Sequence, residues 1–180
     1  MILSMRPRKF VWTLSGSLQE RFGHLTEVKM LNEDYRDILQ LFTDNGVKYL
    51  VVGAYALGAY GFPRATGDID LWVLADGKNS KKIFYCLAKF GAPMEHITEQ
   101  TFCDKDVIFQ IGIVPRRIDI ITKISGVDFE QAYHHREEFV IDNVKVPFIS
   151  KQDLITNKQA TGREKDSIDI KNLLSSKKKK

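Results

Sequence analysis

The feature that most restricts the fold of this chain is a short apolar stretch, DIDLWVLA, which begins at Asp68. Aspartate is depleted in β-strands, because its short side chain prefers to bond nearby backbone groups in turns. The two-residue period of a strand puts Asp68 and Asp70 on one face together with Trp72. The opposite face carries Ile69, Leu71 and Val73. We therefore predict a strand whose apolar face packs into the core and whose other face holds a rigid pair of carboxylates.

A second apolar strand, RIDIIT, carries one aspartate in the same manner, at Asp119. The stretch VIFQIG precedes it, and the turn residues Val114 and Pro115 lie between them, so the two stretches are predicted to form a hairpin. If the three aspartates converge, like charges about 4 Å apart repel by roughly 4 kcal/mol per pair at an effective dielectric near 20. Such a cluster needs a cation.

Two interpretations of the three aspartates are open at this point. All-oxygen ligands select hard ions, so a convergent set favours Mg²⁺ or Mn²⁺ over zinc. Alternatively, Asp68 caps a turn, Asp70 faces solvent, and Asp119 pairs with Arg116 or Arg117. A zinc site is not indicated, because the chain has only four histidines and its two cysteines, at 86 and 103, lack a CxxC spacing. We expect both thiols to be free and structural.

A strand, a glycine and a helix follow one another directly in VKYLVVG and AYALGAYG, with Gly53 at the junction. Backbone N–H groups are unpaired at the start of a helix, and they form a natural cradle for phosphate. The signal is weak by itself, since any strand-to-helix turn can use a glycine for its backbone freedom.

The remaining patterns complete an α+β chain with a small mixed β-sheet and helices packed on it. A helix is expected from the N-cap Asn32 to Gly46, and another over residues 78–91. The stretch FVIDNVKVPFI is typical of a hairpin, and two further helices are expected over 151–160 and 164–174. We assign residues 31–174 to one domain. The flanks are an N-terminal extension of uncertain structure, 1–30, and a lysine-rich tail, 175–180.

The net charge of +4 is located at the two ends of the chain. Lys177 to Lys180 supply four positive charges, and Arg6, Arg8 and Lys9 supply three, so residues 10–176 carry 4 − 4 − 3 = −3. The body is therefore not a basic nucleic-acid-binding surface. The tail is expected to be solvated, with anchoring to RNA as the alternative. No apolar run approaches the roughly 18 residues of a membrane span, so a cytoplasmic protein with no membrane partner is expected.

Three sequence blocks together resemble the nucleotidyltransferase superfamily that includes DNA polymerase beta. They are YLVVGAYALGAYGFPRATGDIDLWV, PRRIDIIT and KQATGREKD, and the resemblance covers about residues 31–174. An RxTxDID pattern is matched by Arg64, Thr66, Asp68, Ile69 and Asp70, and a KxAxGRxKD pattern by Lys158 to Asp166. The chain is most similar to the small bacterial branch related to abortive-infection and toxin-antitoxin nucleotidyltransferases. The resemblance implies a nucleotidyltransferase fold.

The resemblance also implies roles for individual residues. The residues expected to be catalytic and to bind Mg²⁺ or Mn²⁺ are Asp68, Asp70 and Asp119. Those expected to contact the nucleotide are Gly53, Ala54, Arg64, Thr66, Lys158 and Arg163. The chain departs from the family at Ala54, where the usual junction is Gly-Gly or Gly-Ser. Asp166 and Asp169 are expected to be helix-surface residues.

The implied activity is transfer of a nucleoside monophosphate from an NTP to an acceptor hydroxyl, with release of pyrophosphate. The acceptor is a tRNA or other RNA, a protein side chain or a small molecule. The alternative is a catalytically silent binding module of the same fold, such as the antitoxin-like partner in a two-protein system, which would bind another protein. The departure at Ala54 and the short chain favour this second interpretation somewhat.

Overall fold

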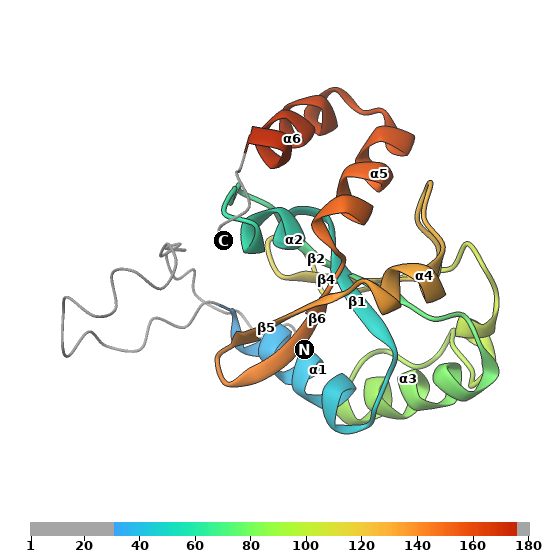
Figure 1. Cartoon of the computed structure of the whole chain (residues 1–180). Helices are drawn as coiled ribbons and strands as arrows, with labels where there is room; N and C mark the ends of the chain where they lie inside the picture. Colours follow the sequence, from blue (N-terminus) through green and yellow to red (C-terminus); the bar gives the residue numbers. More distant parts are fainter. Residues whose placement is uncertain (1–30, 176–180) are drawn as a thin grey trace, which may run out of the picture.

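Six strands form one mixed sheet in the computed structural model, which describes residues 31–175. Their order is β3-β4-β2-β1-β6-β5 (Figure 1). The strands are β1 Tyr49–Val52, β2 Asp68–Val73, β3 Ile108–Ile111, β4 Arg117–Ile121, β5 Glu137–Ile141 and β6 Val144–Phe148. The two hairpins predicted from the sequence are present as the antiparallel pairs β3–β4 and β5–β6. The α+β class with a small mixed sheet is confirmed.

Six α-helices pack on this sheet within the described part of the chain. They are α1 Glu33–Asp44, α2 Gly53–Ala59, α3 Gly77–Phe90, α4 Phe129–His134, α5 Lys151–Thr161 and α6 Glu164–Ser175, with a short 3₁₀ turn at Thr101–Cys103. The predicted N-cap of the first helix is confirmed, because Asn32 Oδ1 accepts a hydrogen bond from the Tyr35 amide at 2.8 Å. No described helix is long and apolar enough to span a membrane.

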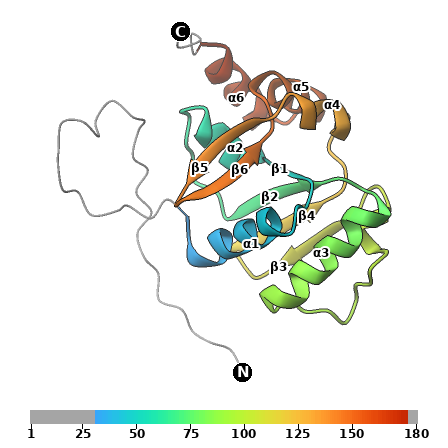
Figure 2. The same ribbon diagram turned by 60° about the horizontal axis from the view of Figure 1, so that its bottom comes forward.

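Helices α1 and α3 lie together on one face of the sheet (Figure 2). This is the face of Ile69, Leu71 and Val73, since Tyr49 of β1 is the register partner of Val73 and its ring meets Phe42 of α1 at 5.4 Å. The apolar residues on this face of β2 are buried. The prediction that the apolar set of DIDLWVLA faces the core is therefore correct.

The opposite face of β2 is covered by α4 near Trp72 and is more exposed near Asp68 and Asp70. Trp72 is buried under α4, where its ring meets Phe129 at 4.9 Å and its indole N–H donates to the Thr122 carbonyl at 3.3 Å. Asp68 and Asp70, at the start of the same strand, are only half-buried. The carboxylate end of this face is thus accessible while the rest of the strand is anchored in the core.

Helices α5 and α6 pack against each other at one end of the sheet, where α5 also contacts α2 (Figure 1). Both cysteines are free, as expected; Cys86 is buried and Cys103 half-buried. The expectations for the extension 1–30 and for Lys177 to Lys180 fall outside the described residues.

Candidate active site

The three predicted aspartates lie on two adjacent parallel strands. The register of β2 with β4 pairs Asp70 with Asp119 and Asp68 with Arg117. Because partners in register share a face of the sheet, the side chains of Asp68, Asp70 and Asp119 rise from the same face. Asp119 is buried, with 6% of its surface exposed. The pairing of β2 with β4 therefore brings together residues that lie about fifty positions apart in the sequence.

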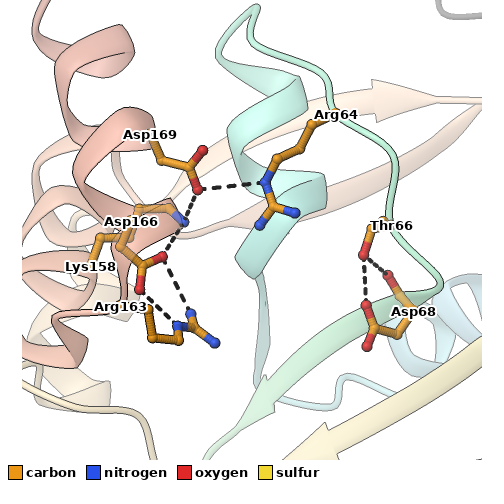
Figure 3. Close-up of polar contacts among 7 residues, drawn as sticks. All are labelled: Arg64, Thr66, Asp68, Lys158, Arg163, Asp166 and Asp169. Atoms are coloured by element: carbon orange, nitrogen blue, oxygen red, sulfur yellow. Dashed lines mark hydrogen bonds and ion pairs between the residues drawn. The ribbon is translucent and has the colours of Figure 1, made fainter.

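Arg117 bridges two of these aspartates. Its Nη2 donates to Asp68 Oδ2 at 2.6 Å, and its Nε donates to Asp119 Oδ1 at 2.7 Å. Gln110 of β3 donates a further hydrogen bond to Asp119 Oδ2 at 3.1 Å, and the Thr66 hydroxyl donates to Asp68 Oδ1 at 2.7 Å (Figure 3). The pairing of Asp119 with Arg117, one part of the second interpretation of the sequence, is observed. Arg117 as a bridge to Asp68 was missed, because only the strand register discloses it.

Within the described part of the chain, Asp70 has no such cationic partner in direct contact. Burial raises the pKa of its carboxyl group to about 6, and the negative charges of Asp68 and Asp119 act in the same direction. The positive charges of Arg163 and Arg117 oppose this rise only in part. Without a bound cation, the protein therefore disfavours the ionised form of Asp70. This is expected for a carboxylate that belongs to a cation site.

The glycine of the strand-to-helix junction is required by Asp70. Gly53 has φ = +65°, and a Cβ atom at this position would lie 2.0 Å from Asp70 Oδ2. Any side chain would collide with the carboxylate, and L residues rarely adopt this backbone conformation. The glycine thus lets Asp70 lie directly against the start of α2, beside the buried residue Ala54.

Lys158, one of the residues expected to contact the nucleotide, is buried inside the protein. Only 2% of its surface is exposed. Its ammonium group donates to Asp166 Oδ1 at 3.1 Å and to Asp169 Oδ2 at 2.6 Å, linking α5 to α6. The prediction that Asp166 and Asp169 are helix-surface residues is wrong: they are 0% and 3% exposed. They are buried because the face of α6 that carries them packs against α5.

Each of these buried aspartates also contacts an arginine (Figure 3). Arg163 Nε donates to Asp166 Oδ2 at 2.7 Å. Arg64 Nε lies 3.5 Å from Asp169 Oδ2, but it is a buried atom that makes no hydrogen bond to a described residue. Burial by itself would raise the pKa of Asp166, but the hydrogen bonds from Arg163 and Lys158 outweigh it and hold that pKa below its usual value.

The donor chemistry of the site fits a hard divalent cation and a phosphate. Aspartate oxygens are the ligands that Mg²⁺ and Mn²⁺ prefer, and the raised pKa of Asp70 indicates a need for positive charge. The guanidinium group of Arg64, whose side chain is 34% exposed, is a donor of the kind that binds anions. Within residues 31–175, however, no group of three His, Cys, Asp or Glu side chains is spaced to hold a metal ion. Instead, the guanidinium group of Arg117 forms ion pairs with Asp68 and Asp119.

A mixed sheet of this topology, with carboxylates on adjacent strands, is the arrangement of the nucleotidyltransferase fold. Residues 28–178 match the model of a protein family described as Nucleotidyltransferase of unknown function (DUF6036). The chain belongs to this family. A comparison with curated proteins finds no significant match.

Solved structures of nucleotidyltransferases share the fold. The lincosamide antibiotic adenylyltransferase LnuA, bound to lincomycin, is 20% identical with a TM-score of 0.53; the match covers 81% of this chain and 97% of LnuA. A nucleotidyltransferase-like protein from Thermotoga maritima is 14% identical with a TM-score of 0.55, over 79% of this chain and 91% of its own. The antibiotic-resistance factor ANT(2'')-Ia is 17% identical with a TM-score of 0.50, over 78% and 80%. At these identities the similarity concerns the fold.

Proposed function

We propose that this protein transfers a nucleoside monophosphate from an NTP to a hydroxyl group of an acceptor, in a reaction that depends on Mg²⁺ or Mn²⁺. The observation that carries the proposal is the register of β2 with β4, which puts Asp68, Asp70 and Asp119 on one face. Membership of a nucleotidyltransferase family supports it. The acceptor oxygen would form a bond to the α-phosphorus as the bond to pyrophosphate breaks.

The proposed roles follow from the positions of the side chains. Asp68 and Asp70 would hold a divalent cation that neutralises the triphosphate, and Asp119 would complete the site on the acceptor side. A bound cation of this type lowers the pKa of an acceptor hydroxyl and stabilises the departing pyrophosphate. Asp119 would orient the acceptor hydroxyl and favour loss of its proton. Gly53 and Thr66 lie next to these carboxylates, and together with Ala54, which follows Gly53 in the chain, they would border the nucleotide.

A small molecule is the first acceptor class to test. LnuA is named as an adenylyltransferase of lincosamide antibiotics, and ANT(2'')-Ia as an antibiotic-resistance factor. The acceptor-class experiment incubates the protein with each of the four labelled NTPs, Mg²⁺ or Mn²⁺ and a cell lysate, and separates small molecules, RNA and protein. Label is expected in one fraction, and not with Asp70→Asn. Label in RNA or protein would redirect the acceptor class. No transfer with any NTP would contradict the enzymatic proposal.

The contact of Arg117 with Asp68 and Asp119 favours a second candidate, a binding module without catalysis. In that case the guanidinium group would permanently replace the metal ion, and Ala54 would replace the usual second glycine or serine. The protein would then act through a partner, as an antitoxin-like member of a two-protein system does.

A titration with Mn²⁺ separates the two candidates. For the enzyme, Mn²⁺ with NTP should bind to the wild type and displace Arg117 from the aspartates. For the silent module, the wild type should bind no Mn²⁺ even with NTP, whereas Arg117→Gln, which frees both carboxylates, should gain about tenfold or more in affinity. Electron paramagnetic resonance of free Mn²⁺ measures this directly. Lys123→Gln, which breaks an exposed pair with Asp106, serves as the charge control.

A further inference from the structure

Lys158, Asp166 and Asp169 form a buried ion cluster, hereafter the Lys158 cluster, which the proposed chemistry does not use. The three residues are 2%, 0% and 3% exposed. Burying charges away from water is costly unless each finds opposite charge and hydrogen bonds. A pair of apolar residues would hold α5 against α6 at lower cost. The presence of three buried ionic groups therefore calls for a role besides packing.

The Lys158 cluster contacts two more charged groups at its border. Arg163 binds Asp166 through Nε at 2.7 Å and through Nη2 at 3.4 Å, and Arg64 lies against Asp169 at 3.5 Å. Three cations and two anions leave one net positive charge in the set of five. Lys158 has both of its carboxylate partners inside the cluster, so the excess charge is available only on the arginines, whose side chains are 54% and 34% exposed.

Both arginines are directed at the carboxylate site from different segments. The positive charge of Arg163, at the start of α6, acts on Asp70 more strongly than that of Arg117 does. Arg64 belongs to the loop before β2, two residues before Thr66, which holds Asp68. In Figure 3 the two guanidinium groups extend from the α6 side and from this loop toward the same region beside β2. The contacts with the aspartates use Nε and Nη2 of Arg163 and Nε of Arg64, and they do not involve Nη1 of Arg163 or the two Nη atoms of Arg64.

We propose that the Lys158 cluster is a positioning device that fixes Arg64 and Arg163 as a two-arginine clamp for the phosphates of the NTP. Asp169 orients Arg64, Asp166 orients Arg163, and Lys158 holds both aspartates in place through its hydrogen bonds to them. Guanidinium groups held on one side by a carboxylate present their remaining N–H donors in a fixed direction, which suits phosphate. The inference rests on the proposed function and changes one part of it: Lys158 acts behind the arginines and does not touch the nucleotide.

A double-mutant cycle tests the positioning role. The probe is inorganic tripolyphosphate with Mg²⁺, which every NTP shares, so the result depends on neither the base nor the acceptor. By calorimetry, Arg64→Gln and Arg163→Gln should each weaken binding by about tenfold. Asp169→Asn should weaken it by about fivefold in the wild type, but by less than about twofold when Arg64 is already glutamine.

The dependence of Asp169→Asn on Arg64 is the readout that a merely structural role would not produce. If Asp169 only stabilised the fold, its replacement would weaken binding equally in both backgrounds, and the positioning role would be overturned. Thermal unfolding checks that all variants are folded. Should Asp169→Asn not fold, the two arginine variants, whose side chains are partly exposed, still test the clamp. If neither arginine variant changes the affinity for tripolyphosphate, the proposal is also overturned.

A charge control and an assay of NTP transfer, run beside the double-mutant cycle, separate this inference from the proposed function. Arg36→Gln removes an arginine that is paired with Asp37 on α1, at 3.2 Å, and should leave tripolyphosphate binding within about twofold. If the cycle behaves as expected while no NTP is transferred to any acceptor, the clamp exists in a protein that only binds nucleotides. If transfer occurs and the cycle is additive, the protein is an enzyme and the positioning role of the Lys158 cluster is overturned. Absence of tripolyphosphate binding in the wild type overturns the clamp.

Discussion

Gly53 shows how a side chain on one strand dictates the residue type at the start of a helix. The residue adopts φ = +65°, and its missing Cβ leaves the space that Asp70 Oδ2 occupies. Sequence patterns explain this glycine by the needs of a phosphate loop or of a tight turn. In the structure it has a further and more specific cause, the close approach of a carboxylate.

Gly53→Ala should lower the free energy of unfolding by at least about 3 kcal/mol, because backbone strain adds to a clash with Asp70. Gly61→Ala is the matched control, since Gly61 also has a positive φ, +93°, but an added Cβ would meet nothing within 4 Å. That control should cost about 1 to 2 kcal/mol. Urea unfolding measures both. Equal costs for the two substitutions would show that Asp70 does not determine the glycine.

Asp70→Asn should stabilise the protein near neutral pH in the absence of divalent cations. The pKa of Asp70 is raised from 3.8 to about 6, so between these values the folded protein holds a proton that the unfolded chain releases. Stability is therefore lost as the pH rises from about 4 to about 6, and the loss persists above. Since asparagine does not ionise, the variant should be more stable than the wild type by about 1 to 3 kcal/mol at pH 7.5 and equal to it near pH 4.

Urea unfolding at the two pH values measures this difference. Addition of Mg²⁺ with NTP should stabilise the wild type more than Asp70→Asn, because the bound cation compensates the charge of the ionised carboxylate. If Asp70→Asn and the wild type differ in stability by the same amount at pH 4 and at pH 7.5, ionisation of Asp70 does not destabilise the folded protein.

At the scale of elements, the pair α5–α6 is held by charges as much as by apolar contacts. Leu154, Ile155 and Leu173 supply buried apolar surface, and the Lys158 cluster lies between the same two helices. Ser150 caps the start of α5, accepting a hydrogen bond from the Asp153 amide at 3.1 Å. The geometry of this helix pair therefore decides where Arg163 lies relative to β2.

Lys158→Met should lower the free energy of unfolding by about 3 to 5 kcal/mol at pH 7, because it leaves two buried carboxylates without their shared cation. The cost should fall at acidic pH, where the carboxylates of the variant are protonated. Lys48→Met is the control: Lys48 forms an exposed pair with Glu130 at 3.8 Å, and its loss should cost less than about 1 kcal/mol. A cost for Lys158→Met no larger than the control would argue against the buried pairing.

At the scale of the whole molecule, charge is distributed unequally between the body and the ends of the chain. Residues 10–176 carry a net −3 and the last four lysines carry +4, out of a total of +4. Arg117 and Arg163 lie beside carboxylates on the body, and other exposed cations, such as Lys123 and Lys145, are paired with acidic residues. A body with net negative charge is poorly suited to bind a long nucleic acid.

Deletion of Lys177 to Lys180 brings the formal net charge from +4 to 4 − 4 = 0. Any affinity of the whole chain for single-stranded RNA should fall by about tenfold or more at low salt, and the slope of log K against log salt should shrink by up to about 3. Fluorescence anisotropy with a labelled oligouridylate measures both quantities. Tripolyphosphate binding should be unaffected. RNA affinity that survives the deletion with an unchanged salt slope would place the RNA contact on the body.

Local sequence patterns predict the strands, the hairpins and the face on which the aspartates lie. Alternation with a period of two is a property of the extended backbone, so DIDLWVLA and RIDIIT disclose their faces without any tertiary information. The N-cap Asn32 was predictable for the same reason, because capping is local. The three sequence blocks pointed to the nucleotidyltransferase fold, and the family match agrees.

The pairing of the charged side chains depends on contacts between distant segments of the chain. Arg117 and Asp68 are 49 positions apart, and their contact at 2.6 Å follows from the register of two strands that are not consecutive in the chain. Asp166 and Asp169 look like solvent-exposed helix residues in the sequence, yet packing of α6 on α5 buries them around Lys158. Helical periodicity cannot disclose this, because a charged face is buried only when a distant segment brings the opposite charge to it.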